Sequence, residues 1–477
     1  MKKFLFALLT AAVAATSLVS AQAPDRSKPP QSGAPPVLKL PAIQKRMLSN
    51  GLPVWTVEHH GVPVVQVNLV VLSGTGDDPA GKFGIASLTA SLLTEGAGSR
   101  SALQIADAVD FLGADLSTNA GSDASAVRLS VPVARLADAL PIMADVALRP
   151  TFPQAELDRQ KLERLTNIIQ ARDDPPSIGQ LGYARVLYGT SHRYGTALAG
   201  SARSIQGFTV EEVRSFYRTA YQPANSAIIA VGDVTPARLI PMLERAFGGW
   251  KGTAGGGAAA LPPAAQLTAR HVYLIDKPGA AQSQVRIGWV GAARSTPDYF
   301  PLRVLNTILG EAFTSRLNTN LREVHGYAYG ASSRFEMRSS AGAFYAAAGV
   351  QTDKTVEALK EFFSELTRIH DPVEPGELDK AKNYLAMLLP RNFETTRGTA
   401  DALAQAWVYD LPADYYSTYA DKVRAVTAAD VKRVADTYIQ PDKFAVVIVG
   451  DRKTIEPGVR ALNLGLVTTV EAAEIMK

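Results

Sequence analysis

The side chains that most often bind metals or act as nucleophiles are scarce in this sequence. Its 477 residues include six histidines and no cysteine, which excludes a thiol nucleophile, thiolate zinc ligands and a disulfide scaffold. His59 and His60 are adjacent and have no partner at ligand spacing, so we expect them to lie in a turn. No Gly-x-Ser-x-Gly segment is present, and a serine hydrolase therefore has no support. These residues alone predict no active site.

Composition and charge are those of a folded globular protein. Hydrophobic residues make up 47% of the chain and charged residues 20%, which is an ordinary balance. The formal net charge is only +4, from 49 Lys and Arg against 45 Asp and Glu. No basic cluster with interleaved aromatic residues is present, so we expect no nucleic acid partner.

The first residues have the pattern of a secretory signal peptide. A basic start is followed by an apolar run over 4–19, and Ala21-Gln22-Ala23 is a typical cleavage site. We therefore expect residues 1–23 to be removed and the protein to be periplasmic. Residues 24–40 are rich in proline and serine and are predicted to form a tether. No later apolar stretch is long enough to predict a membrane span.

The rest of the chain contains an internal repeat. Residues 208–234 and 426–452 align without a gap at an offset of 218, and in both copies a Thr precedes a helical pattern that leads through Gln-Pro to an apolar strand. A repeat this long indicates duplicated domains. We predict a first domain at 41–250, a linker at 251–264, a second domain at 265–465 and a tail at 466–477.

Strand and helix patterns alternate within each half. Residues 62–73 alternate as a strand does, whereas 102–112, 155–172 and 356–368 have helical periodicity with charged outer faces. Strands separated by pairs of helices predict an α+β class, with helices packed on one face of each sheet.

Several motifs in a fixed order resemble those of a known family. They are Ser73 to Gly81, Gly84-Ile85-Ala86, Tyr188-Gly189, His192 to Gly195, Tyr221 to Asn225 and Val231-Gly232-Asp233. Together they resemble the pitrilysin/insulinase family of zinc peptidases, the inverzincins, in the short bacterial form related to mitochondrial processing peptidase. The resemblance covers essentially the whole mature chain. It implies two homologous domains, each a mostly antiparallel sheet in the metallohydrolase fold of LuxS and mitochondrial processing peptidase.

The zinc motif of that family is degenerate in this chain. The family carries His-x-x-Glu-His, in which two histidines on one helical face bind zinc and the glutamate acts as general base. The matching positions here are Ser87, Ala90 and Ser91, and the family's downstream glutamate ligand matches Asn167. Hydroxyl and amide groups do not replace imidazole and carboxylate ligands at a catalytic zinc. We therefore expect this chain to bind no metal or other cofactor.

The second half retains a motif that the resemblance places at the substrate. Residues 315–329 match the family segment Ser-Arg-Leu, Leu-Arg-Glu and a Tyr seven residues beyond the Arg. The resemblance implies that Arg322 and Tyr329 contact the substrate backbone and that Tyr329 helps to stabilise the tetrahedral intermediate. A guanidinium and a phenol suit this role, because both donate hydrogen bonds to an oxygen that gains charge.

Loss of one motif beside retention of the other leads to a functional hypothesis. We expect this chain to be the substrate-contacting subunit of a heterodimeric periplasmic peptidase that hydrolyses peptides. In this heterodimer a homologous partner with His-x-x-Glu-His holds the zinc. An alternative is a catalytically inactive scaffold or peptide-binding protein, which would resemble the core subunits of respiratory complexes. A third possibility, a stand-alone hydrolase with another metal site, finds little support in the residues.

Overall fold

The computed structural model describes residues 42–252 and 261–476. The expected signal peptide at 1–23 and the expected tether at 24–40 lie outside the described residues. The middle of the expected linker, 253–260, also lies outside them. The described residues, with both halves of the chain, belong to one compact unit.

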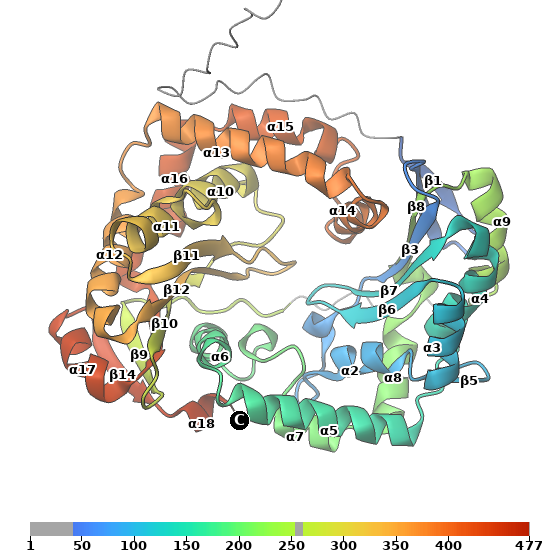
Figure 1. The fold of residues 1–477 in the computed structure, drawn as a ribbon, viewed down its shortest axis with the longest axis horizontal. Helices are drawn as coiled ribbons and strands as arrows, with labels where there is room; N and C mark the ends of the chain where they lie inside the picture. Colours follow the sequence, from blue (N-terminus) through green and yellow to red (C-terminus); the bar gives the residue numbers. More distant parts are fainter. Residues whose placement is uncertain (1–41, 253–260, 477) are drawn as a thin grey trace, which may run out of the picture. The chain divides into compact units, whose positions relative to one another are not determined.

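The first half is built on a mixed six-stranded sheet with the order β1-β2-β8-β3-β7-β6 (Figure 1). Its strands are β1 (Gln44–Met47), β2 (Pro53–Glu58), β3 (Val64–Val71), β6 (Asp115–Ala120), β7 (Ser125–Pro132) and β8 (Ser226–Gly232), and a separate short ladder joins β4 (Gly96–Ala97) to β5 (Arg100–Ser101). The helices are α2 (Ile85–Leu92), α3 (Ala102–Phe111), α4 (Leu136–Leu148), α5 (Gln154–Ala171), α6 (Pro175–Tyr188), α7 (Ala202–Gly207), α8 (Val210–Ala220) and α9 (Pro236–Phe247). All pairings in the large sheet are antiparallel except that of β2 with β8.

The second half repeats this plan with the order β11-β12-β10-β13-β9-β14. Its strands are β9 (His271–Asp276), β10 (Gln282–Val290), β11 (Ala328–Phe335), β12 (Ala343–Gln351), β13 (Ala445–Gly450) and β14 (Leu466–Val470). The helices are α10 (Tyr299–Asn306), α11 (Arg316–Asn318), α12 (Thr355–Arg368), α13 (Pro375–Leu388), α14 (Thr396–Val408), α15 (Tyr415–Ala425), α16 (Ala428–Tyr438), α17 (Arg452–Ala461) and α18 (Ala472–Ile475). The predicted α+β class of two similar halves is confirmed.

The sequence repeat corresponds to one helix and one strand in each half. Thr209 and Thr427 are the N-caps of α8 and α16, and each side chain accepts a hydrogen bond from the backbone three residues later. The helices lead to β8 and β13, which occupy the same place in the two sheet orders. The repeat is therefore structural, as predicted.

Helices cover both faces of each large sheet, whereas the sequence pattern predicts helices on one face only. In β8, Ile228 faces the helices of its own half, whereas Ile229 packs with Leu403 of α14 from the other half. In β13, Val446 faces its own helices and Val447 packs with Ile178 of α6. Each half thus lends one helix to the sheet of the other (Figure 1). Side chains that alternate between two apolar faces explain why both strands are entirely buried.

The expected tail at 466–477 is corrected by the structure. Leu466–Val470 forms β14, which pairs in parallel with β9 at the edge of the second sheet. Its residues, Leu-Val-Thr-Thr-Val, are mostly β-branched and favour an extended strand. The following turn of helix brings Ile475 and Met476 into the apolar cluster beneath α6. The segment is therefore part of the second half.

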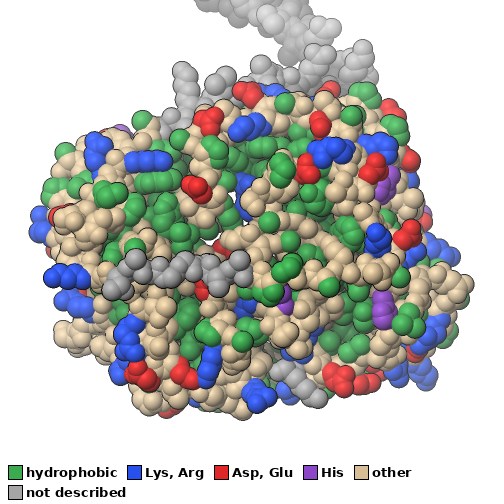
Figure 2. Space-filling model, turned by 180° about the vertical axis from the view of Figure 1, so that it is seen from behind, with side chains coloured by type: hydrophobic (Ala, Val, Ile, Leu, Met, Phe, Trp, Pro, Cys, Tyr) green, Lys and Arg blue, Asp and Glu red, His purple; other side chains and the backbone are tan. Residues whose placement is uncertain are grey.

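The described surface is mixed in charge. Acidic and basic side chains are interspersed over the face shown in Figure 2, in keeping with the small net charge. Within 42–252 and 261–476, no helix combines the length and the apolar character needed to cross a bilayer.

Candidate functional site

Helix α2 carries the three positions that match the zinc motif. The helix starts after Gly84, whose φ of +101° is readily adopted by glycine. A Cβ atom at Gly84 would also clash with the backbone carbonyl of Ala199. Within the helix, Ala90 is buried, whereas Ser87 and Ser91 are partly exposed on the side that faces α5. The local sequence therefore places the two hydroxyls four residues apart on one helical face.

The guanidinium of Arg164 lies across these two serines. From α5, its Nη1 donates to Ser87 Oγ at 3.1 Å, and its Nη2 donates to Ser91 Oγ at 2.8 Å and to the Ser87 carbonyl at 3.1 Å. Arg164 is 9% exposed, and burial lowers the pKa of its guanidinium. Asn167, one turn further along α5, is exposed. A positive charge thus lies across two of the positions that match the zinc motif.

This arrangement does not fit a zinc ion. The side chains at the four matching positions offer two hydroxyls, a methyl group and an amide, and the hydroxyls already bond to a cation. A zinc site needs imidazole, thiolate or carboxylate donors, and a neighbouring guanidinium repels a metal cation. No group of three or more His, Cys, Asp or Glu suited to a metal is found among the residues that the structure describes.

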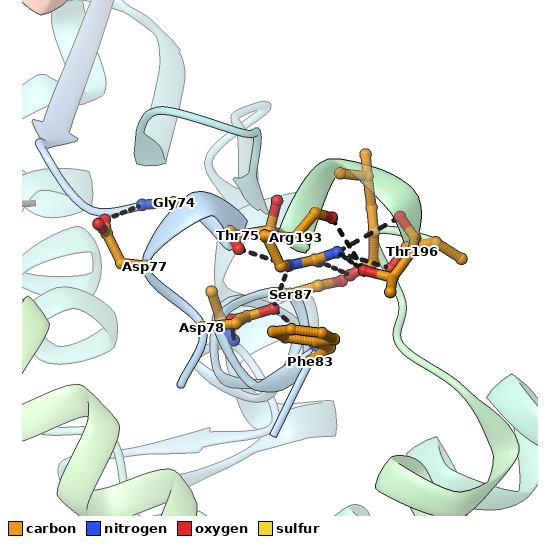
Figure 3. Close-up of polar contacts among 12 residues, drawn as sticks. Gly74, Thr75, Asp77, Asp78, Phe83, Ser87, Arg193 and Thr196 are labelled. Carbon is orange, nitrogen blue, oxygen red and sulfur yellow. Dashed lines mark hydrogen bonds and ion pairs between the residues drawn. The ribbon is translucent and has the colours of Figure 1, made fainter. Parts of the chain in front are cut away.

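A buried ion pair supports the start of α2 (Figure 3). Asp78 accepts hydrogen bonds from the backbone N–H groups of Gly84 at 2.6 Å and Ala86 at 2.9 Å. N–H groups at a helix N-terminus have no acceptor within the helix, and Asp78 provides one. Arg193 Nε donates to Asp78 at 2.9 Å and also to the Thr75 carbonyl. Burial raises the pKa of Asp78 to about 6, although Arg193 and the two amides act in the opposite direction. The network joins the 73–81 loop, α2 and the 192–195 loop.

Arg193 uses its remaining donors within its own loop. Its Nη1 donates to the carbonyl of Ala197 at 3.1 Å and to Thr196, and its Nη2 donates to the carbonyl of Leu198 at 3.2 Å. The side chain of Arg193 is 1% exposed. The role of this arginine is therefore to hold the fold around α2.

Arg322 and Tyr329 lie next to each other in the second half. Arg322 is on a turn of π-helix, Thr319–Val324, and Tyr329 is near the start of β11. The guanidinium carbon of Arg322 lies 5.5 Å from the centre of the Tyr329 ring and 4.3 Å from that of Phe313. Tyr329 is 89% exposed and Phe313 66% exposed. The pair presents a guanidinium and a phenol to the outside of the chain.

The structure does not bring these two sets of residues together. Arg164 and Asn167 line a cavity of about 1180 Å³, which also involves α6, the 192–195 loop, Arg286 and Tyr345. Neither Arg322 nor Tyr329 is among the described residues that line this cavity. Within one copy of the chain, the Arg/Tyr pair therefore does not face the α2 corner.

Three of the histidines contact carboxylates, a backbone carbonyl or an aromatic ring. His60 pairs with Asp233 through Nδ1 at 2.6 Å, and His192 Nε2 lies 2.9 Å from the Pro262 carbonyl oxygen. His325 stacks on Tyr327 with ring centres 4.9 Å apart. His60 also lies 3.4 Å from Glu58 through Nε2. None of these contacts forms a metal site among the described residues.

Sequence reasoning missed Arg164 as a residue of the site. It lies in a stretch of α5 with Arg159 and Glu163, which is the charge pattern of a solvated helix face. The spacing could have predicted it, because Arg164 precedes Asn167 by three residues and residues three apart share one face of a helix.

Two profiles of one peptidase family match the chain. The profile described as "Insulinase (Peptidase family M16)" matches residues 54–180, and the profile described as "Peptidase M16 inactive domain" matches residues 207–385. The first match includes α2 and α5, and the second includes Arg322 and Tyr329.

Relatives and solved structures agree with these matches. An uncharacterized zinc protease of Streptomyces coelicolor is 24% identical over 402 residues, which cover 82% of this chain and 86% of the relative. The crystal structure of a peptidase M16 inactive domain from Pseudomonas fluorescens has a TM-score of 0.78 and 26% identity, covering 86% of this chain and 98% of that one. A protease from Helicobacter pylori has a similar fold, with a TM-score of 0.79 and 21% identity over 86% of this chain and all of that one.

Proposed function

Since the chain belongs to the M16 (insulinase) family of peptidases, we propose that it is the substrate-contacting subunit of a two-chain zinc peptidase. In this proposal a homologous partner carries His-x-x-Glu-His and the zinc. This chain supplies Arg322 and Tyr329 and binds no metal itself. The proposed complex hydrolyses peptides in the periplasm, as the pattern of residues 1–23 suggests.

The observation that carries the proposal is the exposure of the Arg/Tyr pair. The only ion pair of Arg322 with a described carboxylate is a 3.4 Å contact with its neighbour Glu323. The Tyr329 side chain is almost fully exposed. Donors left free by their own chain are available to a group outside it, and a carbonyl oxygen that gains negative charge is the acceptor they suit.

The proposed roles follow from the chemistry of the two side chains. The Arg322 guanidinium has several N–H donors in a fixed plane and would hold a peptide carbonyl in place. The Tyr329 hydroxyl would donate to the oxygen that becomes negatively charged during hydrolysis. The zinc and its chemistry belong to the partner in this scheme, because the α2 corner of this chain offers no suitable ligands.

Co-expression with a zinc-bearing homologue tests the proposal. The pair should cleave a fluorogenic peptide faster than the homologue alone. Arg322→Ala and Tyr329→Phe should each lower the kcat of the pair by roughly 10²–10³-fold, the effect of removing an oxyanion-type donor. Tyr384→Phe is a matched control, since Tyr384 is another solvent-exposed tyrosine but lies on α13, away from Arg322 and Tyr329 in the sequence.

Two results would contradict the proposal. Equal rates for the pair and for the homologue alone would show that this chain adds nothing to catalysis. Unchanged rates for Arg322→Ala and Tyr329→Phe, in a pair that is active, would favour the alternative of an inactive scaffold or peptide-binding protein.

A further inference from the structure

The cavity between the two halves has a strongly positive lining. Among the described residues that line it, seven are Lys or Arg and one, Glu336, is acidic. The cationic residues are Lys82, Arg164, Arg185, Arg193, Arg203, Arg286 and Arg338. This excess is local, because acidic and basic residues are nearly balanced over the whole chain.

Three of these cations are neutralised by the chain itself. Lys82 pairs with Glu212, Arg193 with Asp78, and Arg338 with Glu336. The other four form no ion pair with any carboxylate of the described residues; they are Arg164, Arg185, Arg203 and Arg286. The cavity therefore keeps several positive charges without counter-charges.

Two of the unpaired guanidinium groups also have unused donors. The Nε atoms of Arg164 and Arg185 are buried and have no hydrogen-bond acceptor. Arg185 Nη1 donates only to the Glu474 carbonyl, at 2.7 Å. Burial lowers the pKa of both side chains. A buried cation without a counter-charge is costly, and an anion that enters the cavity would reduce this cost.

The remaining surfaces of the cavity suit an extended organic ligand. Its volume of about 1180 Å³ exceeds the roughly 300–1,000 Å³ of a pocket for a drug-sized molecule. The guanidinium carbon of Arg286 lies 4.7 Å from the centre of the Tyr345 ring, a cation–π contact that helps to hold the guanidinium at the cavity wall. A planar guanidinium in a fixed position binds a carboxylate through two parallel hydrogen bonds.

We propose that this cavity binds the carboxylate groups of an acidic peptide, with Arg164 and Arg286 as the main anchors. The corner that holds zinc in other family members would here present a guanidinium to the same class of substrate. This inference takes the peptide nature of the ligand from the proposed function. The binding it predicts is a property of the single chain and needs no partner.

Isothermal titration calorimetry on the purified chain tests this proposal. The probes are two acetylated and amidated octapeptides, one of alternating Glu and Ala and one of alternating Lys and Ala. We expect the Glu peptide to bind at least about tenfold more tightly, since each charge-assisted hydrogen bond contributes measurably to affinity. Its affinity should fall as salt is raised to about 0.3 M. A third octapeptide of Gln and Ala with a free C-terminus separates a terminal carboxylate from side-chain carboxylates.

Variants assign the binding to the cavity. Arg286→Gln and Arg164→Gln should each weaken binding of the Glu peptide by roughly tenfold. Arg172→Gln is the matched control and should change the affinity less than about twofold, because Arg172 is exposed at the end of α5 and is not among the lining residues. If Arg164→Gln fails to fold, Arg286→Gln and Arg203→Gln still decide the result.

Several outcomes would overturn the inference. Equal affinity for the Glu and Lys peptides would exclude charge selection by the cavity, and absence of binding of every carboxylate peptide would exclude the site. Equal weakening by Arg172→Gln and Arg286→Gln would mean that only the net charge matters. Because no partner is present, failure here leaves the two-chain peptidase standing, and failure of the co-expression test leaves peptide binding standing.

Discussion

Arg193 and Arg322 belong to motifs in different halves of the chain, and their surroundings are opposite. The side chain of Arg193 is 1% exposed, and its guanidinium donates to Asp78 and to several backbone carbonyls. The side chain of Arg322 is 29% exposed and contacts Glu323 and two aromatic rings. A motif residue whose donors are all used inside the chain stabilises the fold, whereas one with free donors is available for binding.

The largest expected effect tests the first half of this comparison. Arg193→Met removes the partner of buried Asp78 and should lower the free energy of unfolding by about 3–5 kcal/mol, the usual result of leaving one charge of a buried pair alone. Urea denaturation followed by circular dichroism measures this loss. A loss below about 1 kcal/mol would show that the network is not important for stability.

The loss should also depend on pH. In the native chain the pKa of Asp78 is raised to about 6, and removal of Arg193, which lowers it, should raise it further. A carboxyl group with a raised folded pKa binds more protons when folded, so its contribution to stability falls as pH rises towards that pKa. Above pH 6 the contribution of Asp78 to stability no longer changes in the native chain, because the carboxyl group is ionised in both states. In the variant this contribution continues to fall, because the folded pKa of Asp78 is higher. The destabilisation by Arg193→Met should therefore be larger at pH 8 than at pH 5.

The sequence predicted much of the fold because its signals are local. The repeat at an offset of 218 and the apolar runs of β8 and β13 were sufficient to predict two similar α+β halves. The exchange of α6 and α14 was not predicted, since the pattern of a helix shows that one face is buried but not which sheet covers it. The strand Leu466–Val470 was missed because five residues near the end of a chain carry a weak signal.

The site was predictable only where a motif specified positions. The family pattern directed attention to Ser87, Ala90, Ser91 and Asn167, and the structure places the first three on α2 and the last on α5. The pattern says nothing of Arg164, since no motif position requires an arginine there. Its burial results from the packing of α5 on α2, which is a tertiary contact that charge spacing along one helix does not reveal.

A much smaller effect is expected for the second arginine. Arg322→Met should change the free energy of unfolding by less than about 0.5 kcal/mol, because a partly exposed arginine with one weak ion pair contributes little to stability. The same urea titration measures this change, and Arg193→Met in parallel gives the contrast. If Arg322→Met were as destabilising as Arg193→Met, Arg322 would be a structural residue, and the proposed role at the substrate would lose its physical basis.

The smallest expected effect concerns an exposed pair just after the carboxyl ends of the neighbouring strands β2 and β8. His60 Nδ1 lies 2.6 Å from Asp233, and this hydrogen bond, with the charges of Asp233 and Glu58, raises the pKa of His60. The pair therefore stabilises the fold fully below the unfolded pKa of 6.5, and this stabilisation is lost as pH rises through the raised folded pKa. Thermal unfolding should show a Tm advantage of native over His60→Gln of about 1 °C or less near pH 5.5, and none near pH 8.5. In an Asp233→Asn background the Tm advantage should shrink at the lower pH.

A Tm advantage of the native chain that grew as pH rose would contradict this prediction, because the raised pKa of His60 requires the opposite trend. A destabilisation by His60→Gln as large as that by Arg193→Met would also contradict the comparison. It would mean that the exposure of a charged side chain does not distinguish residues that stabilise the fold from residues that are available for binding.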